Sequence, residues 1–595
     1  MAETENPNPE TGGVFVPDPA RADAATGKTF ELGLIMAGAI SAGAYTAGVV
    51  DFLIEAMDAW EAAKAAPGFD GPMHDVRLKV MTGASAGAMT SAIAAVSLYG
   101  EIDPVRDVDN PPPPERNRLY DSWVKRVDIA NMLGTEDIER DGRLVSVLDA
   151  SSLDGIANGS LTVPRRAVPR KWVSDPLAVF LAVSNLRGVP YGFTLHGGDG
   201  ASVYGMTAHK DHMGFSVSPS RAEIAATRLL DPAEAPGADW PVLAEAALAS
   251  GAFPVGLRSR ALSRPWVDYA DRVRSRHPLF ADDPDEESYG FLCVDGGMID
   301  NEPLELARNY LAGGGRNPRA GEAANRAVIM IDPFPNKVSL ADDNSAKDGV
   351  LDIVGAIFGA LMNQARFKPE ELALAESDEN YSRFMISPTR FDADKKRIEP
   401  AMASATLGGF GGFLSEQFRR HDFQLGRRNC QRFLARHLTL PETNPVFDGW
   451  QGDGTRDDWY IRDNDGVFDR VSDTDDTRLL PIIPLMDAVA NPVPQYTPPQ
   501  AATVDMDALE EQIAARTKAV GAVLIDRDLR DILEGRGTGA RLYRQGARRP
   551  ALTACGAACG ESALCYALSV SFPVRSPETG TNPEFTRKNN AFSIC

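Results

Sequence analysis

Two strand–loop–helix units in immediate succession constrain the fold of this chain more than any other feature of its sequence. The apolar run Phe30–Met36 predicts a buried strand, and a helix is expected from about Ala44 to Ala65, after the small-residue loop AGAISAG. The run Val76–Thr82 predicts a second strand, which the tight turn Gly83–Gly87 and a second helix follow. Because successive strands joined through helices run in the same direction, this pattern predicts an α/β fold built on a parallel sheet.

Later segments extend the predicted sheet. The stretch Pro176–Gly188 is nearly all apolar, as a central strand should be, and Tyr191–Gly197 predicts another strand. The chain is expected to return in a strand that ends at Asp295, and Ala327–Pro335 is expected to form the last strand of the sheet. Between the first two units and these strands, Arg118–Leu133 predicts a helix.

The length of 595 residues exceeds the size at which one hydrophobic core usually stops growing, so more than one unit is expected. Residues 1–28 have the composition of a disordered leader. Residues 29–338 hold the predicted sheet and form the α/β unit. Residues 339–595 are expected to form a mainly helical C-terminal extension, with helices over Gly349–Ala365 and Met506–Glu534.

The charge of the chain limits its partners. The formal net charge is -22 and the pI is near 4.9, whereas nucleic acid binding requires clustered positive charge, so no nucleic acid partner is expected. The apolar runs are too short or too interrupted to span a bilayer, and the N-terminus has no secretory signal pattern. Six cysteines in a chain of this kind indicate reduced thiols. A cytoplasmic location is therefore expected.

Metal binding is not expected either. Four cysteines cluster toward the C-terminus, but they lack the close Cys or His pairs that are typical of a zinc site. These residues are Cys555, Cys559, Cys565 and Cys595.

Ser85 is the candidate nucleophile. The pattern GASAG places it on a sharp turn between a strand and a helix, where Gly83 and Gly87 avoid clashes and the helix N-terminus favours developing negative charge. A plain glycine-rich turn is the alternative interpretation of these five residues. A serine hydroxyl also needs a neighbouring base that accepts its proton, because it is otherwise a poor nucleophile.

Asp295 is the candidate base. It ends an apolar strand, and Gly296 and Gly297 behind it allow another backbone to approach closely, although an ordinary Asp-Gly turn would also favour these residues. No histidine after Ser85 follows a strand in the short loop where a Ser-His-Asp triad would place it. These histidines are His196, His209, His212, His277, His421 and His437.

Four segments in this order resemble the patatin-like phospholipases. The segments are GAYTAGV (Gly43–Val49), GASAG, ASGAFPVGL (Ala249–Leu257) and DGGMIDNEP (Asp295–Pro303), and they span most of residues 30–335. The resemblance implies a three-layer α/β/α catalytic domain with a Ser-Asp dyad and no cofactor. Ser85 would attack the carbonyl of a lipid acyl ester such as a phospholipid, and Asp295 would accept its proton and later activate water.

The loop AGAISAG (residues 37–43), called the first loop below, departs from this family, in which the corresponding loop usually reads Gly-Gly-Gly-x-Arg/Lys-Gly. The resemblance assigns the oxyanion hole to backbone N–H groups of Gly38, Ala39, Ile40 and Gly43. Alanine and isoleucine keep their N–H groups, so the hole is expected to survive if the loop needs no positive φ at the β-branched Ile40. A catalytically impaired scaffold or lipid-binding protein of the same fold is the alternative. A nucleotide-binding loop is disfavoured because AGAISAG does not match GxGxxG.

The segment Leu407–Leu438 is the one clearly basic region of an acidic chain, with six arginines and several Phe and Leu residues. A helix with arginines on one face could contact a phospholipid surface as a peripheral membrane element. The alternative is a helix that packs on the acidic α/β unit through ion pairs. The sequence makes no prediction of oligomeric state.

Overall fold

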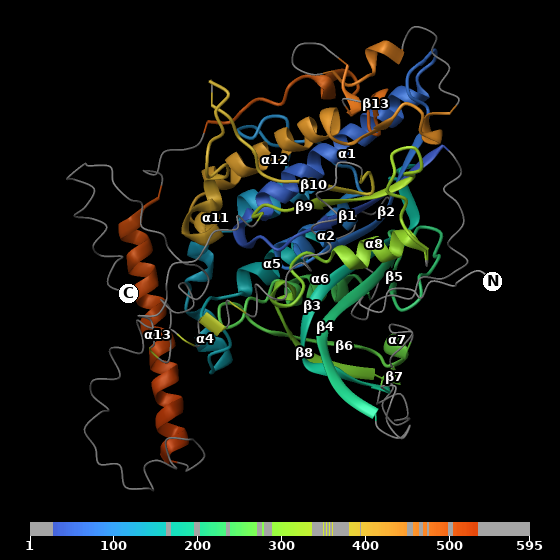
Figure 1. Ribbon diagram of the computed structural model, residues 1–595. Helices are drawn as coiled ribbons and strands as arrows, with labels where there is room; N and C mark the ends of the chain where they lie inside the picture. The colour runs from blue at the N-terminus through green and yellow to red at the C-terminus, as the bar shows by residue number, and fades with distance from the viewer. Residues whose placement is uncertain are drawn as a thin grey trace.

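The computed structural model describes most of the chain between residues 28 and 533 (Figure 1). The described ranges are 28–161, 168–194, 203–233, 239–270, 277–278, 288–313, 315–335, 380–392, 394–448, 456–462, 468–472, 475–497 and 504–533, with isolated positions between 349 and 360. The predicted leader, the predicted helix Gly349–Ala365 apart from those positions, and the cysteine-containing tail lie outside these ranges.

A large sheet with a parallel centre organises the molecule, as the sequence predicts. Five strands run parallel in the order β10-β9-β1-β2-β3, and β4 and β5 follow β3. The pairing β3–β4 is antiparallel and β4–β5 is parallel. The strands are β1 (Thr29–Met36), β2 (Asp75–Gly83), β3 (Val173–Thr194), β4 (Val203–Val217), β5 (Arg228–Leu230), β9 (Arg326–Ile331) and β10 (Arg383–Ile386).

The two strands predicted over Pro176–Gly188 and Tyr191–Gly197 form one long strand, β3, in the described residues. The pairing with β4 shifts register between Ser184 and Val189, so the Gly-Val-Pro segment interrupts the ladder without ending the strand. The outer half of β3 continues beyond the parallel part of the sheet, as Figure 1 shows. There it pairs with the antiparallel strands β7 (His277–Pro278) and β8 (Ser288–Val294), and β6 (Arg260–Pro265) pairs with β8. Asp295 therefore follows an antiparallel strand.

The prediction that Ala327–Pro335 ends the sheet is wrong. The strand β9 forms there, but β10 pairs with it and extends the sheet by one more strand. Segments from both sides of the expected boundary at residue 338 consequently share one sheet. They also share one hydrophobic core, in which Phe30, Tyr45, Phe423 and Leu434 are all buried.

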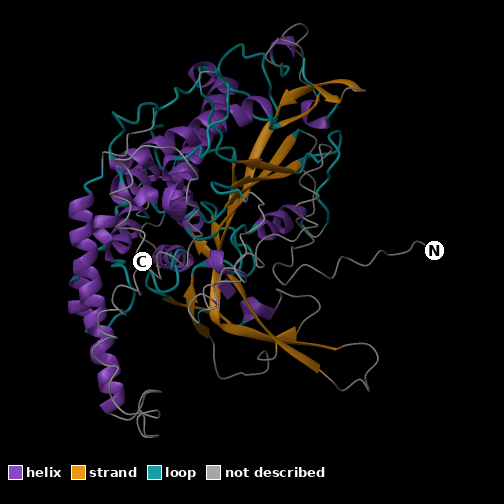
Figure 2. Ribbon diagram, turned by 60° about the vertical axis from the view of Figure 1, so that its left-hand side comes forward, coloured by secondary structure: helices purple, strands orange, loops and turns teal. Residues whose placement is uncertain are grey.

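Helices cover both faces of the sheet, and most of them lie on one side, as Figure 2 shows. On that side α1 (Gly43–Ala65), α2 (Ala86–Ser97) and α12 (Glu416–Arg436) belong to the larger core cluster. On the other face α8 (Leu304–Ala312) packs on Ile35, Val80 and Phe180. The helix from Ile40 to Ala65 is long and apolar enough to cross a membrane, but almost all of it is buried inside the protein.

The remaining elements are mostly short. The region predicted as one helix over Arg118–Leu133 is broken into α3 (Arg118–Tyr120), a π-helical turn (Asp121–Arg126) and a 3-10 turn (Ile129–Met132). A small second sheet contains β11 (Thr439–Pro441), β12 (Arg470–Ser472) and β13 (Asp475–Pro481). The other helices are α4 (Glu136–Asp141), α5 (Ser151–Ser160), α6 (Trp240–Ser250), α7 (Val267–Ala270), α11 (Gly411–Leu414) and α13 (Met506–Leu533).

The basic segment Leu407–Leu438 packs against the α/β unit, mainly through α12. A Cβ atom on Gly48 of α1 would overlap the Phe423 carbonyl oxygen, and one on Gly426 would overlap the Tyr45 carbonyl oxygen, so the two helix backbones meet at their glycines. Arg427 is buried in ion pairs with Asp51 and, at 2.5 Å, with Glu55. These contacts are those of the ion-paired alternative rather than of a free basic face.

Candidate active site

Ser85 lies on a strained turn between β2 and α2. Its φ of 52° and ψ of -125° are unusual for a residue with a side chain, and its N–H donates to Ser250 Oγ at 2.9 Å. A Cβ atom on Gly87 would overlap the Met36 carbonyl oxygen, and one on Gly83 would overlap the Gly87 carbonyl oxygen. The two glycines predicted for this turn are therefore required by close backbone packing.

Asp295 lies within hydrogen-bond distance of Ser85, although 210 positions separate them in the sequence. Ser85 Oγ donates to Asp295 Oδ2 at 2.7 Å, and Asp295 Oδ1 accepts the Gly297 N–H at 2.7 Å. The Asp295 main chain is fixed as well, because its carbonyl oxygen accepts from Ser184 Oγ at 2.7 Å. A Cβ atom on Gly296 would overlap the Ala182 carbonyl oxygen, which gives that glycine the close-approach role expected from the sequence.

Burial changes the acidity of the Asp295 carboxyl group. Removal from water raises the pKa of Asp295 to about 6, although the hydrogen bonds from Ser85 and Gly297 act in the opposite direction. The carboxyl group is thus ionised near neutral pH, yet it is a much better proton acceptor than an ordinary aspartate. Both properties suit a general base that acts on a hydroxyl group.

The first loop follows β1 at the same edge of the sheet as Ser85, because Met36 and Gly83 are partners in the parallel register. The N–H of Gly38, one of the predicted oxyanion donors, donates to the Asn301 carbonyl oxygen at 3.1 Å and so already has a backbone partner. A Cβ atom on Gly38 would overlap Asn301 Oδ1, so this glycine instead allows the chain to pass close to the segment after Asp295. A Cβ atom on Gly43 would overlap the Trp123 ring, which gives Gly43 a packing role.

Ile40 has a φ of 49°, so the structure does not meet the condition under which the oxyanion hole was expected to survive, namely no positive φ at Ile40. A 3-10 turn runs from Ile40 to Ala42, and Ala39 directly precedes it. The first N–H groups of such a turn have no hydrogen-bond partner within the turn. The N–H of Ala86, the first residue of α2, likewise has no hydrogen-bond partner within its own helix. Of the four predicted loop residues, Ile40 is the one that lines the cavity beside Ser85.

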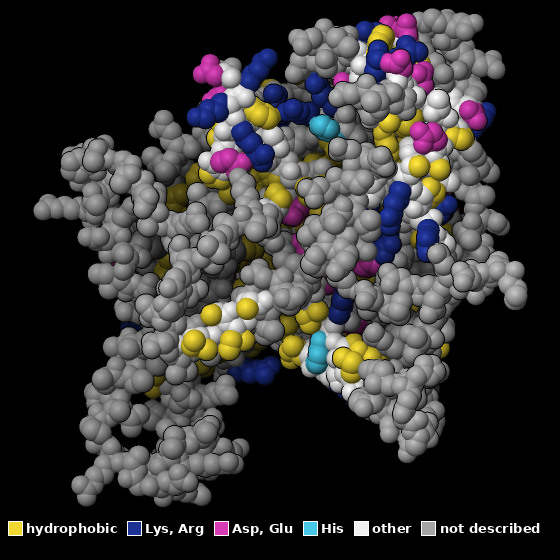
Figure 3. Space-filling view, in the orientation of Figure 1, with side chains coloured by type: hydrophobic (Ala, Val, Ile, Leu, Met, Phe, Trp, Pro, Cys, Tyr) yellow, Lys and Arg dark blue, Asp and Glu magenta, His cyan; other side chains and the backbone are white. Residues whose placement is uncertain are grey.

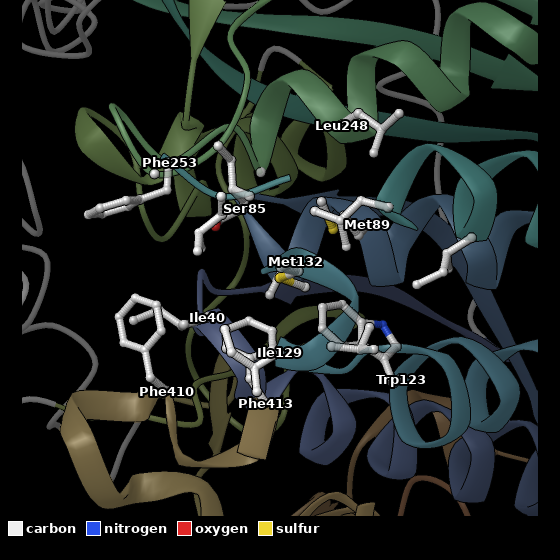
Figure 4. A pocket seen from close by; sticks show the side chains of 18 of the residues that line it. Ile40, Ser85, Met89, Trp123, Ile129, Met132, Leu248, Phe253, Phe410 and Phe413 are labelled. Atoms are coloured by element: carbon white, nitrogen blue, oxygen red, sulfur yellow. The ribbon is translucent and has the colours of Figure 1, made fainter. Parts of the chain in front are cut away.

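A cavity of about 230 Å³ opens beside the Ser85 hydroxyl, and most of the side chains that line it are apolar (Figure 4). Ser85 lies between Phe253 and Met89 in this view, with Ile40 and Met132 below it. Elements from many parts of the chain form the walls: α2, α5, α6, the π-helical turn, the segment 407–414 and α13. Hydroxyl and carboxyl groups come from Ser85, Ser122 and Asp295.

Helix α13 contributes one stripe of side chains to this site. Met506, Leu509 and Ile513 line the cavity, and Arg516 and Val520 continue the same three-and-four spacing. Arg516 is fully buried, forms an ion pair with Asp137 and donates to the carbonyl oxygens of Gly134, Val147 and Ser146 at 2.6, 2.7 and 3.1 Å. The helix is thus attached to the loops on either side of α4, which also line the cavity.

Several residues of the site have no local sequence signal. Ser250 of α6, Ser184 of β3 and Asn301 of the loop before α8 position Ser85, Asp295 and the first loop, and only the fold brings them together. The serine and aspartate were predictable because each has its own glycine pattern. No group of three or more His, Cys, Asp or Glu side chains in the described part of the chain is arranged to hold a metal ion.

Comparison with known proteins identifies relatives without assigning an activity. No family model matches the sequence. The crystal structure of VipD from Legionella pneumophila covers 66% of this chain and 67% of its own, at 14% identity and a TM-score of 0.21, which is too low to support an argument. The uncharacterized protein y4iI of Sinorhizobium fredii is 38% identical over 556 residues, which cover 84% of this chain and 77% of that protein. The chain belongs to the same protein family as y4iI.

Proposed function

We propose that the chain is a serine hydrolase of lipid acyl esters, of the patatin-like phospholipase type. The observation that carries the proposal is the 2.7 Å hydrogen bond from Ser85 Oγ to the buried Asp295 Oδ2, at the edge of an apolar cavity. The ordered motifs described above support the family assignment. The parallel sheet with helices on both faces, to which β10 from beyond residue 338 also belongs, supports a three-layer α/β/α catalytic domain.

In the first half of the reaction, Ser85 Oγ attacks the ester carbonyl carbon and Asp295 accepts the hydroxyl proton. The tetrahedral intermediate then expels the alcohol oxygen of the ester, and that oxygen takes the proton back from Asp295. The products of this half are a free alcohol and an acyl group bound to Ser85. The raised pKa of Asp295 favours both transfers, since the carboxyl group must accept and release one proton.

In the second half, water takes the place of the alcohol. Asp295 accepts one proton of the water, the resulting hydroxide attacks the acyl carbonyl carbon, and Ser85 leaves with the proton from Asp295. The acid product departs and the dyad returns to its starting state. Each step uses the same two side chains.

Backbone N–H groups would stabilise the oxyanion of each tetrahedral intermediate. Ala86 at the start of α2 and the Ala39–Ile40 turn are the candidate donors, since both lie next to Ser85 and neither position has a partner within its own helix. The N-terminal end of α2 adds a favourable field for negative charge. Loss of one such donor typically lowers kcat by about 10²- to 10³-fold.

The cavity supports a lipid as the source of the acyl group. Its apolar walls would accommodate a hydrocarbon chain, while the ester carbonyl remains beside Ser85. A phospholipid or another acyl ester would reach the site as a monomer or from a membrane surface, which fits a cytoplasmic enzyme that contacts membranes peripherally.

The test compares hydrolysis of phosphatidylcholine vesicles and of a soluble p-nitrophenyl ester by four proteins. Ser85→Ala and Asp295→Asn should each lower kcat/KM by about 10³-fold or more. Ser97→Ala is the matched control, because it removes a buried hydroxyl that bonds only within α2, to the Ile93 carbonyl oxygen. Inactivity of the folded wild type on both substrates and on a wider ester panel would favour the scaffold alternative.

A further inference from the structure

The segment Ala403–Leu414, named here the 403–414 segment, packs directly on the first loop of the active site. Ser41, which follows Ile40, is fully buried and its hydroxyl bridges the two parts of the chain. Ser41 Oγ donates to the Gly409 carbonyl oxygen and accepts the Gly412 N–H at 3.1 Å. Residues 368 and 371 positions apart are thereby joined at the candidate oxyanion loop.

Glycines in the 403–414 segment make this approach possible. A Cβ atom on Gly412 would lie 2.5 Å from Ser41 Oγ, closer than any real contact allows. Gly409 has a φ of 96°, which residues with a side chain rarely adopt, and a Cβ atom there would lie 3.5 Å from Ile40 Cδ1. The Ser41 hydroxyl therefore depends on the shape of this segment, and the Ile40 side chain packs beside it.

Helix α12 holds the 403–414 segment in place from the other side. Asp422, which is fully buried, accepts the N–H groups of Ala403 and Ser404 at 2.8 and 3.0 Å. Arg419, also buried, donates to the Gly412 carbonyl oxygen at 2.7 Å. Since α12 is itself packed on α1, the segment is fixed at both ends of its contact with Ser41.

The first loop needs such support because of Ile40. A β-branched residue at a φ of 49° is a strained conformation, and such conformations persist only where the surroundings enforce them. Ile40 directly precedes Ser41, whose hydroxyl is held by Gly409 and Gly412. The conformation of Ile40 sets the direction of the first N–H groups of the 3-10 turn.

We propose that Ser41 is a positioning residue that uses the 403–414 segment to hold Ile40 in its left-handed conformation and to aim the loop N–H groups at the oxyanion. The role assigned to these N–H groups rests on the proposed function. The clamp explains how a loop with isoleucine at this position keeps its shape. It also makes the 403–414 segment part of the active site.

The first test measures kcat and KM for Ser41→Ala. The expected result is a loss of kcat of about tenfold to a hundredfold with KM within about twofold, because the loop would act on the transition state more than on substrate binding. The control Ser97→Ala should leave both constants near wild type. Equal kcat for Ser41→Ala and wild type would overturn the proposal.

A double-mutant cycle with Ile40→Gly separates positioning from packing. Glycine adopts a positive φ without strain, so the clamp should matter little once Ile40 is replaced. The kcat of Ile40→Gly and of Ile40→Gly/Ser41→Ala should then agree within about threefold. If Ser41→Ala lowers kcat by the same factor in both backgrounds, Ser41 does not act through Ile40 and the proposal fails.

Hydrogen–deuterium exchange gives a readout that does not depend on catalysis. Amides of residues 38–44 should exchange at least about fivefold faster in Ser41→Ala than in wild type, whereas peptides of α8 should not change. If the wild type neither hydrolyses esters nor reacts with a fluorophosphonate, the proposed function fails, but faster exchange would still support the clamp. Unchanged exchange in that region would refute the clamp itself.

Discussion

At the scale of a single residue, two opposed effects set the pKa of the Asp295 carboxyl group. Burial raises the pKa of Asp295 to about 6, and the hydrogen bonds from Ser85 and Gly297 restrain that rise. The group therefore changes its charge within the pH range where the protein can be assayed. Its ionisation should be visible both in catalysis and in stability.

The pH dependence of kcat/KM should show the ionisation of Asp295. The base is active only when deprotonated, so the rate should rise with pH up to about 6 and level off above it. Steady-state assays with a soluble ester between pH 4.5 and 8 measure this profile. An acidic limb near pH 4 would mean that Asp295 is exposed to water or is not the base.

The stability of Asp295→Asn should exceed that of wild type at neutral pH. A carboxyl group whose folded pKa lies above its unfolded value of 3.8 binds its proton more tightly in the folded state. The wild type therefore loses stability as the pH rises from about 4 to 6, by about 3 kcal/mol for a shift of roughly two units.

Urea denaturation of both proteins at pH 7.5 and at pH 4.5 checks this prediction. The asparagine variant should be the more stable protein at pH 7.5, and the difference should be much smaller at pH 4.5, where the folded Asp295 carboxyl group is protonated and therefore neutral. A variant less stable than wild type at both pH values would show that the ionised carboxylate is well solvated or well paired.

At the element scale, helices α1 and α12 pack backbone to backbone. Glycines at Gly48 and Gly426 allow the two backbones to touch, and the Arg427 ion pairs with Asp51 and Glu55 are buried beside them. Because α12 also anchors the 403–414 segment, this contact links the core of the sheet to the first loop of the active site.

Gly426→Ala should destabilise the protein, although alanine is the better helix former. The new methyl group would overlap the Tyr45 carbonyl oxygen, and overpacking of this kind costs about 1–3 kcal/mol, more than the gain of up to about 1 kcal/mol in helix propensity. Gly155→Ala is the control, because Gly155 lies in α5 with the nearest atom, on Arg126, 3.9 Å from the new carbon. Thermal unfolding should give opposite signs for the two variants.

Helix α13 is attached through Arg516, and this attachment can be tested separately. Arg516→Met would leave the Asp137 carboxylate without its partner in a buried position, at a cost of about 3–5 kcal/mol. The expected result is rapid hydrogen exchange throughout α13. Lys518→Met, an exposed change on the same helix, should have little effect. Equal exchange in the two variants would show that the apolar stripe alone holds the helix.

The whole molecule shows which parts of a fold a sequence reveals. The strands β1 and β2 and helices α1 and α13 were predictable because each has its periodicity within one segment. The addition of β10 to the sheet was not, since four residues carry no signal for a partner more than fifty positions away. Ser85 and Asp295 were found through their glycine patterns, whereas the Gly38 contact and the Ser41 bridge depend on segments that only the fold brings together.

At the scale of the whole molecule, the sequence also did not show where the arginines of α12 lie. Arginines of α12 that looked like a basic surface in the sequence are buried against acidic side chains and backbone carbonyl groups, as Arg419 and Arg427 are. On the face shown in Figure 3, basic and acidic side chains lie beside one another over the upper part of the molecule. Two of the six arginines in the basic segment thus serve the internal structure, whereas Arg432 and Arg436 are exposed.

Covalent labelling of Ser85 tests the central claim most directly. The full chain is incubated with a fluorophosphonate at pH 7.5, and mass spectrometry of the peptides locates and times the modification in wild type, Asp295→Asn and Ser97→Ala. The account predicts rapid modification of Ser85 in wild type and in Ser97→Ala, and a rate at least about a hundredfold lower in Asp295→Asn. Absence of modification at Ser85 in the folded wild type, or an unchanged rate in Asp295→Asn, would contradict it.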